Sequence, residues 1–478
     1  MQNTCDILIT NAKLVIPKEG IIKKDILIEN QKIKAITNST DNISYSKKIN
    51  VNEKFVLPGL IDPHIHYGVF SSIEQASRTE SRSAAIGGVT TIMRMIRLRE
   101  SYKQKIIEHL KASENNHFID YSIHASILNS IQVEDIPYLY SLGITSFKLY
   151  MNLGSVENRI LMDMNPYENK LLPAHINVTD DLCKKVLKES FSNANNSIVL
   201  VHAEDHNMCS DLINKNKTRN SNNIYNPLEI WSKSRPTESE VIAIKKIMNF
   251  ARQFQSNIYF VHIGSNDALD TILKEKQVGG CNVYIETCPH YLTHSTDYKN
   301  IKGKVVPPLR SKNDIAALWV ALRNGVVDTI GTDHVANVLK LKYGENKDIW
   351  SSLAGFPGVA TMLPVLLHYG INAGQIPIEK LVELTSYNAS RIFGMYPKKG
   401  TIQKDSDADL VIIDLDLIKK VNSKELQSFS DYSIYDDYVL QGWPSITISR
   451  GEVIMENGVV YDNKLGHGKF IKRNTKLK

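Results

Sequence analysis

The sequence lacks several features that would assign a protein class at once. None of its 478 residues belong to an apolar run of ~18 residues, so we expect no membrane-spanning helix. Its five cysteines show neither CxxC spacing nor a disulfide framework, which favours a reducing, cytoplasmic location. The first residues, MQNTCDILITNAKLV, lack the basic, apolar and small-residue order of a secretory signal. Secreted, membrane and disulfide-stapled classes are therefore disfavoured.

Motifs of several enzyme classes are also missing. No GxGxxG follows the first strand-like segment of the central region, which argues against an open doubly wound sheet, the alternative fold. There is no GxSxG, and Cys288 has no evident base partner for nucleophilic catalysis. The net charge of +6 is mild, and the basic segment KFIKRNTKLK at residues 469–478 is predicted to be a solvated tail. We therefore expect no nucleic-acid partner.

Both ends of the chain read as antiparallel β-structure. Residues 1–57 contain short strand-like segments between turns, such as CDILIT and DILIEN. The same pattern returns near the C-terminus in ADLVIIDLD and SITISRGEVIMENGVV. We predict a small β-sandwich accessory domain made from residues 1–57 and 400–478.

The central region, residues 58–399, alternates short apolar strands with longer amphipathic segments. The eight strand candidates are LPGLIDPHIH, VTTIMRM, DYSIHASI, ITSFKLYM, SIVLVHAE, NIYFVHIG, CNVYIETC and VDTIGTDH. This alternation over that length predicts an α/β fold, a (β/α)8 TIM-type barrel. The segment Asn152–Thr179 has weak periodicity and two prolines, so it is predicted to be a long loop over one barrel mouth.

Residues of metal-binding type stand at the ends of these strands. They are His64 and His66 on the first strand, Lys148 on the fourth, His202 on the fifth, His262 on the sixth and Asp333 on the eighth. A lone strand histidine is usually a hydrogen-bonded core residue, as expected for His124, and a lone Asp333 could cap a helix. A lone Lys148 could extend its amine to the solvated rim. Because barrel strands end at one mouth, the six together predict a metal site.

The strand motifs GLIDPHIH, TSFKLYM, VHAE, VHIGS, ETCPHYL, VPPLRS and GTDH together resemble those of the cyclic amidohydrolases. That family comprises hydantoinases, dihydropyrimidinases, allantoinases and dihydroorotases. The resemblance covers essentially the whole chain, including DADLVIID and GWPSITISRGEVIMENG near the C-terminus. It implies a metal-dependent hydrolase that opens a small cyclic amide, such as a hydantoin or dihydropyrimidine ring.

The resemblance also implies a binuclear centre of two divalent metal ions, most often zinc. The implied ligands are His64, His66 and Asp333 for the more buried ion, and His202 and His262 for the more exposed one. Lys148 would bridge the ions as N6-carboxylysine, the carbamate formed with carbon dioxide. A water held between the metals would attack the ring carbonyl, and Asp333 would act as general base and then acid. His290 and His334 would orient ligands or substrate.

Two positions near the centre depart from family patterns. Dihydroorotases carry an arginine directly after HxH, whereas this chain has Tyr67, which argues against dihydroorotate. The tyrosine that hydantoinases usually carry after the bridging lysine aligns with Leu153. Tyr150, on the same strand face as Lys148, or Tyr67 could supply the missing hydrogen bond to substrate. Either could instead pack against the barrel wall.

Other predicted substrate contacts come from loops. LAGFPGVATMLPVLL resembles the family's substrate-gripping loop, so backbone groups near Ala354 and at Thr287 and Cys288 would hold the ring. Ala360 stands near the family's glutamate position after PG. The side chains offered by the segment over the mouth are Leu161, Met162, Met164 and Tyr167. They could line a pocket for an apolar ring substituent, since methionines adapt readily, or could simply pack on the surface.

Alternatives to hydantoin-type hydrolysis follow from the same resemblance. An allantoinase or dihydroorotase-like enzyme would use the same chemistry on another ring. Dihydropyrimidinase-related scaffolds keep the fold but have lost metal ligands, whereas every expected ligand is present here. The resemblance further implies a homo-oligomer, with a tetramer favoured.

Overall fold

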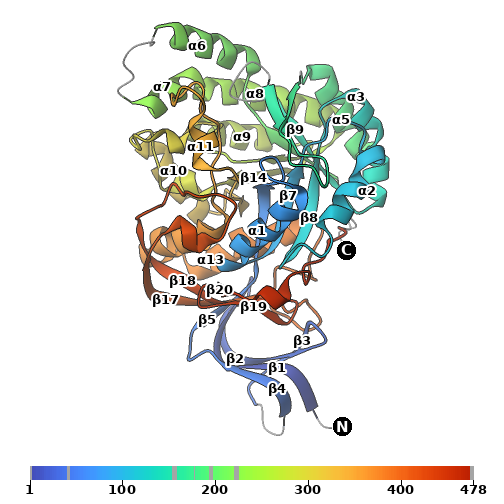
Figure 1. Ribbon diagram of the computed structural model, residues 1–478, viewed down its shortest axis with the longest axis vertical. Helices are drawn as coiled ribbons and strands as arrows, with labels where there is room; N and C mark the ends of the chain where they lie inside the picture. The colour runs from blue at the N-terminus through green and yellow to red at the C-terminus, as the bar shows by residue number, and fades with distance from the viewer. Residues whose placement is uncertain are drawn as a thin grey trace.

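The chain forms a barrel with a β-sheet domain at one end. The computed structural model describes residues 3–39, 43–152, 159–176, 178–192, 197–219 and 226–473. The barrel and its helices occupy the upper part of Figure 1, and strands from both chain ends lie below it. No helix found in these residues combines the length and apolar character that a membrane crossing requires.

Eight parallel strands close the barrel, as the sequence predicted. In chain order they are β6 (Leu60–His66), β7 (Val89–Ile96), β8 (Asp120–Ser126), β9 (Ser146–Tyr150), β12 (Ile198–His202), β13 (Asn257–Phe260), β14 (Val283–Thr287) and an eighth in two pieces, β15 (Thr329–Ile330) and β16 (His334–Val335). Each strand pairs with the next, β15 pairs with β14, and β16 pairs back with β6. The split eighth strand thus completes the ring.

Glycine is required where the eighth strand divides. A Cβ on Gly331 would lie 2.7 Å from Glu286 Oε2 and 2.9 Å from His64 Cβ. Since ordinary side chains cannot approach so closely, only glycine lets the strand pass β14 and β6 at this distance. The break leaves Asp333 outside regular pairing and beside the barrel mouth.

Helices surround the barrel between its strands. The described α-helices are α1 (Ile73–Ile86), α2 (Tyr102–Ser113), α3 (Ser130–Glu134), α4 (Ile136–Ser141), α5 (Asp180–Ser192), α6 (His206–Arg219), α7 (Pro227–Ser234), α8 (Thr237–Phe254), α9 (Asn266–Val278), α10 (Lys312–Arg323), α11 (Leu339–Tyr343), α12 (Met362–Leu366), α13 (Ile378–Val382) and α14 (Asn388–Ile392). In α8, the buried residues Ala243, Ile244, Ile247 and Met248 recur at helical spacing. They form the apolar face that packs in the core shared with the barrel strands.

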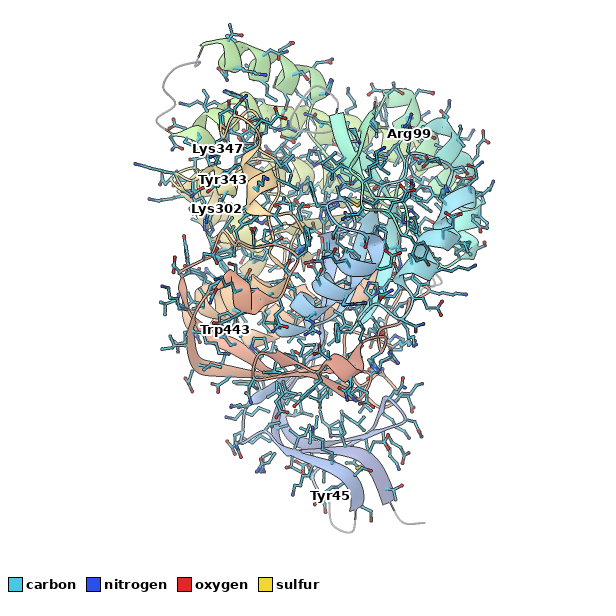
Figure 2. All side chains as sticks on the ribbon, viewed as in Figure 1. Tyr45, Arg99, Lys302, Tyr343, Lys347 and Trp443 are labelled. Atoms are coloured by element: carbon cyan, nitrogen blue, oxygen red, sulfur yellow. The ribbon has the colours of Figure 1, made fainter. Side chains whose placement is uncertain are left out.

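The terminal strands form one mixed sheet, which confirms the β-domain predicted from both ends. Its strands are β1 (Asn3–Ile16), β2 (Gly20–Glu29), β3 (Lys32–Thr37), β4 (Ile43–Asn50), β5 (Phe55–Pro58), β17 (Leu410–Lys420), β18 (Val439–Ser449), β19 (Glu452–Glu456) and β20 (Val459–Val460). The two chain ends join where β5 pairs antiparallel with β17. Figure 2 shows Tyr45 of β4 at the tip farthest from Arg99 and Lys347, which follow barrel strands.

Two local predictions need correction. The segment over the mouth is not only a loop, because β10 (Arg159–Met162) and β11 (Leu172–His175) pair as an antiparallel hairpin whose inner side chains join a small apolar cluster. The C-terminal segment is not a solvated tail as far as Arg473. Ile471 N donates to Tyr121 O at 2.7 Å, and Arg473 is only 4% exposed. Apolar Phe470 and Ile471 dock this segment on the barrel; residues 474–478 lie outside the described residues.

Candidate metal centre

One cavity of about 170 Å³ lies at the carboxyl ends of the barrel strands. Six side chains predicted from sequence line it: His64, His66, Lys148, His202, His262 and Asp333. All six are buried, and the most exposed, Asp333, is 9% exposed. The structure therefore brings together the whole predicted cluster, as the common mouth of a parallel barrel requires.

Asp333 joins the two histidines of β6. Its Oδ1 lies 3.2 Å from His64 Nε2 and 3.3 Å from His66 Nε2. One ligand atom from each of the three lies within 4.8 Å of the others, close enough to hold one ion. Asp333 adopts a left-handed backbone conformation with φ of +49°. Such a conformation costs of order 1–3 kcal/mol, and here it directs the carboxylate toward β6.

His202 and His262 form the other half of the cluster. His202 Nδ1 lies 3.0 Å from His262 Nε2, and the ring centroids are 4.7 Å apart. His262 also has a positive φ, +44°, just after β13. Its ring lies 5.4 Å from that of His64, so the two halves adjoin.

Unpartnered polar atoms show that these residues fit a metal centre. His64 Nε2, His66 Nδ1, His262 Nδ1 and Lys148 Nζ are buried, and each lacks a hydrogen-bond partner among the described residues. Burial lowers the pKa of His64 to about 3 and lowers the pKa of His66 and His262 well below the usual value. The imidazoles are therefore neutral and offer lone pairs. Neutral imidazoles with a carboxylate suit zinc and similar divalent ions.

Lys148 does not reach the solvated rim. Its side chain is completely buried, and its Nζ lies 5.1 Å from the centre of the Tyr150 ring. Burial lowers the pKa of Lys148 to about 7, despite opposing effects of Glu286 and Asp333. Near pH 7, Lys148 is thus a neutral amine in a large fraction of the molecules, and the neutral amine is the nucleophilic form.

Two buried carboxylates that the sequence reasoning missed support the first half. Glu286 Oε1 lies 2.7 Å from His64 Nδ1 and accepts from His262 N at 3.0 Å. Asp62 accepts from the backbone N–H groups of His64 and Thr332 at 3.1 and 3.0 Å. The Glu286 contact leaves His64 Nε2 as the nitrogen that faces Asp333.

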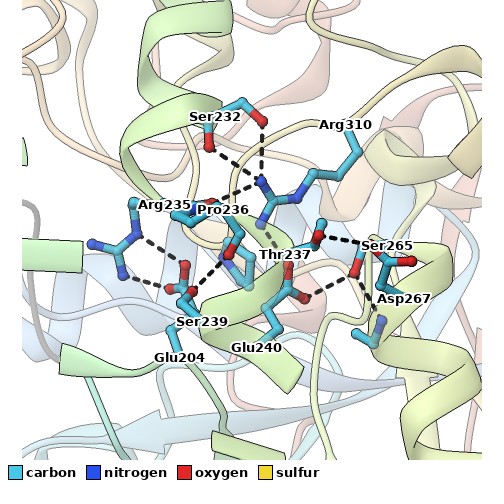
Figure 3. A network of polar contacts seen from close by, with 12 residues as sticks. Glu204, Ser232, Arg235, Pro236, Thr237, Ser239, Glu240, Ser265, Asp267 and Arg310 are labelled. Atoms are coloured by element: carbon cyan, nitrogen blue, oxygen red, sulfur yellow. Dashed lines mark hydrogen bonds and ion pairs between the residues drawn. The ribbon is translucent and has the colours of Figure 1, made fainter. Parts of the chain in front are cut away.

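A third missed carboxylate, Glu204, orients the second half. Glu204 Oε2 lies 2.7 Å from His202 Nε2, and Arg235 donates to both Glu204 oxygens (Figure 3). Burial raises the pKa of Glu204, but Arg235 and His202 outweigh it and lower the pKa to about 2. Figure 3 also shows Arg310 next to this pair, bound to Glu240. Asp62 and Glu204 each stand two residues from a cluster histidine, a spacing that could have revealed them.

Of the predicted substrate contacts, Tyr150 and Ala354 line the cavity. Tyr67 does not: its Oη lies 2.9 Å from His117 Nε2, behind the barrel wall. Thr287, Cys288 and His290 are buried but do not line the cavity either. The predicted position Leu153 lies outside the described residues.

Of the other predicted residues, only some lie away from the cavity. His334 contacts Glu80 Oε2 at 2.9 Å and accepts from Gly358 N, so it orients the loop after the eighth strand. In the hairpin over the mouth, Leu161 lines the cavity, Met162 is buried in the hairpin's own apolar cluster, and Tyr167 is 76% exposed.

The remaining predicted loop and core residues are buried in the protein and do not line the cavity. Met164 and Ala360 are the two loop residues of this group. His124 is a hydrogen-bonded core histidine as predicted, with Nε2 3.0 Å from Pro63 O.

Comparisons with known proteins place this geometry in a family. The profile described as the amidohydrolase family matches residues 172–454. L-hydantoinase of Paenarthrobacter aurescens is 30% identical over 475 residues, 98% of each chain, and D-hydantoinase of Ralstonia pickettii is 29% identical over 98% of this chain and 99% of the other. The solved L-hydantoinase (dihydropyrimidinase) of Arthrobacter aurescens superposes with a TM-score of 0.88 at 29% identity, covering 98% of this chain and 100% of that one. Dihydropyrimidinase of Brevibacillus agri gives 0.85 at 27% identity, covering 98% and 99%. The chain belongs to the amidohydrolase family.

Proposed function

We propose that this chain hydrolyses a ring C–N bond in a cyclic amide of the hydantoin or dihydropyrimidine type. The observation that carries the proposal is the buried cluster of four histidines, one aspartate and one lysine around a single cavity. The hydantoinase and dihydropyrimidinase names of relatives that match nearly the whole chain support the same chemistry. Family membership implies a binuclear metal centre, for which these side chains are candidate ligands.

Zinc and a carboxylated Lys148 are the finer part of the proposal. The neutral amine adds to carbon dioxide: a new N–C bond forms, one amine proton leaves to solvent, and an anionic carboxylate results. That anion removes the problem of an unpartnered buried amine and supplies two oxygens between the halves of the cluster. When bound, two zinc ions supply Lewis acidity at the ring carbonyl and lower the pKa of a water molecule.

Asp333 is the proton carrier of the reaction. Its carboxylate accepts a proton from the attacking water, whose oxygen forms the new bond to the ring carbon. It then donates that proton to the ring nitrogen as the C–N bond breaks, so no covalent enzyme intermediate is needed. Tyr150 lines the cavity, its Oη has no hydrogen-bond partner among the described residues, and burial raises the pKa of its phenol. It stays protonated and is placed to donate to the substrate carbonyl.

Organisation beyond the site belongs to the same proposal. We assign residues 1–57 and 400–478 to the accessory domain, and residues 58–399 to the catalytic barrel. The scattered cysteines favour a cytoplasmic location, and the family resemblance favours a homo-oligomer, with a tetramer as the expected size. Sedimentation analysis of the purified protein checks that size.

A ring-opening assay with measured metal content tests the function. The panel contains hydantoin, dihydrouracil, allantoin, dihydroorotate and a simple cyclic imide. We expect hydantoin or dihydrouracil to open in protein that carries about two zinc ions per chain. Preference for allantoin would redirect the function to that ureide. Metal-loaded protein that opens none of the five would overturn the proposal, and protein unable to retain metal would indicate a non-catalytic scaffold.

A further inference from the structure

An arginine that forms no ion pair with another described residue lines the cavity. Arg97 follows β7 and contributes to the cavity wall beside the metal-ligand candidates. Its Nε is buried and has no hydrogen-bond partner in the part of the chain that is described. Arg94, three residues earlier, is different, since its Nη2 lies 2.6 Å from Asp163 Oδ2. Because guanidinium groups do not lose their proton, Arg97 brings a positive charge to the cavity.

The backbone of Arg97 is held in place by the hairpin over the mouth. Asp163, at the end of β10, donates its backbone N–H to Arg97 O at 3.0 Å. In the carboxylate of the same residue, Oδ2 accepts from Arg94, and Oδ1 has no hydrogen-bond partner among the described residues. Asp163 therefore fixes the position of Arg97 without lying within ion-pair distance of its guanidinium.

A second unpartnered donor lies in the same cavity. Asn152 is 5% exposed, and its Nδ2 has no hydrogen-bond partner within the described ranges. Two buried donor atoms, Arg97 Nε and Asn152 Nδ2, thus lack acceptors among the described residues, which costs free energy unless a ligand supplies them. A carboxylate is the matching group, because it accepts from several donors and forms paired hydrogen bonds with guanidinium.

We propose that Arg97, assisted by Asn152, binds a carboxylate carried on a substituent of the ring substrate. The preferred substrates are thus hydantoin-type or dihydropyrimidine-type rings with an acidic substituent, which rests on the proposed ring-opening function. Ile160 and Leu161 line the same cavity and provide apolar contacts for the stem of that substituent. Met162, which could have formed an apolar substituent pocket, is instead buried within the hairpin's own cluster.

A matched pair of substrates tests this specificity. 5-(Carboxymethyl)hydantoin and 5-(carbamoylmethyl)hydantoin have nearly the same shape and differ in charge. We expect the wild-type protein to prefer the acid in kcat/KM by about 10- to 100-fold, the usual effect of a charge-assisted pair. Arg97→Gln should abolish the preference through a higher KM for the acid. Arg97→Lys should retain part of the preference.

Control and binding measurements make the outcome decisive. Arg99 is exposed, so Arg99→Gln alters a nearby positive charge outside the cavity and should keep the preference. N-carbamoylaspartate should bind the wild-type protein more tightly than N-carbamoylasparagine, and Arg97→Gln should remove that difference. Equal kcat/KM for both rings, or a preference that survives in Arg97→Gln, would overturn this proposal while ring opening itself stands. If neither ring nor the wider panel is opened, the proposed function fails, and this inference fails with it.

Discussion

Lys148 and Lys399 are both completely enclosed by protein but have opposite surroundings. Lys399 Nζ lies 2.8 Å from Asp120, 3.2 Å from Asp407 and 2.5 Å from Asp409. Burial lowers the pKa of Lys399, but the three carboxylates outweigh burial and raise it. Lys148 has no hydrogen-bond partner among the described residues, and burial lowers its pKa to about 7. The partners, rather than burial, separate a structural lysine from a reactive one.

The same contrast distinguishes the two clusters of potential metal ligands. Asp120, Asp407 and Asp409 approach one another as closely as a metal site requires. Lys399 already supplies their cation, and Arg450 Nε adds a contact to Asp120 at 3.1 Å. Asp120 belongs to β8, and the other two aspartates lie just before β17. This network therefore joins the barrel to the terminal sheet. Carboxylates that lie close enough to bind a metal ion can therefore be neutralised by a buried lysine instead.

Loss of Lys148 is the largest effect that the comparison predicts. Lys148→Ala should reduce kcat/KM by about 10³-fold, because the proposed carbamate would contribute several kcal/mol of metal-dependent transition-state stabilisation. Ring-opening assays and metal analysis of the same sample measure the change. Acetate or propionate added with zinc should restore part of the activity by placing a carboxylate in the space left. A variant with full activity and both metals would show that no carbamate is needed.

Loss of Lys399 should affect stability rather than chemistry. Lys399→Met leaves three buried carboxylates without their ammonium partner, so the free energy of unfolding should fall by about 3–5 kcal/mol. Urea denaturation of chelator-treated protein measures it. Lys148→Met is the matched control, and it should change stability by less than about 1 kcal/mol because Lys148 Nζ has no hydrogen bond to another described residue. Equal destabilisation by the two variants would mean that burial alone, and not the charged partners, determines how much each lysine contributes to stability.

Lys342 offers an intermediate case, with neutral partners. Its Nζ donates to the carbonyls of Lys304, Leu353 and Gly355 at 2.7, 2.7 and 2.8 Å. Lys342→Met should destabilise the protein by about 2 kcal/mol, less than Lys399→Met, because the carbonyls left behind carry no net charge. Leu353 and Gly355 line the cavity, so KM should rise more than kcat falls. Steady-state kinetics beside denaturation separate the two effects, and an unchanged KM would show that other contacts hold this segment.

The barrel and the metal-ligand cluster could be predicted because they depend on order along the chain. Strand ends in a parallel barrel meet at one mouth, so His64 and Asp333 are brought together whatever the details of packing. The side chain of Tyr67 could not be placed in this way. Gly68 has a φ of +85°, the chain turns just after β6, and Tyr67 packs behind the wall.

The tertiary contacts of some side chains could not be predicted from the sequence either. Arg97 contacts the hairpin through its backbone carbonyl, which accepts from Asp163 N, whereas Arg94 pairs with the Asp163 carboxylate; only the folded hairpin reveals this difference. The docking of Phe470 and Ile471 on the barrel likewise depends on tertiary contacts that the sequence does not reveal. Two apolar residues in a basic segment give no sign of which surface they will meet.

An exposed lysine sets the lower end of the comparison. Lys233 Nζ lies 2.6 Å from Glu229 Oε1 on α7, a distance similar to the 2.5 Å from Lys399 to Asp409. The side chain of Lys233 is nevertheless 65% exposed, and water and salt screen its charge. Lys233→Gln should therefore change the free energy of unfolding by less than about 0.5 kcal/mol, and added salt should reduce even that. A loss as large as that of Lys399→Met would mean that contact distance, not the dielectric surroundings of the pair, determines what a lysine contributes.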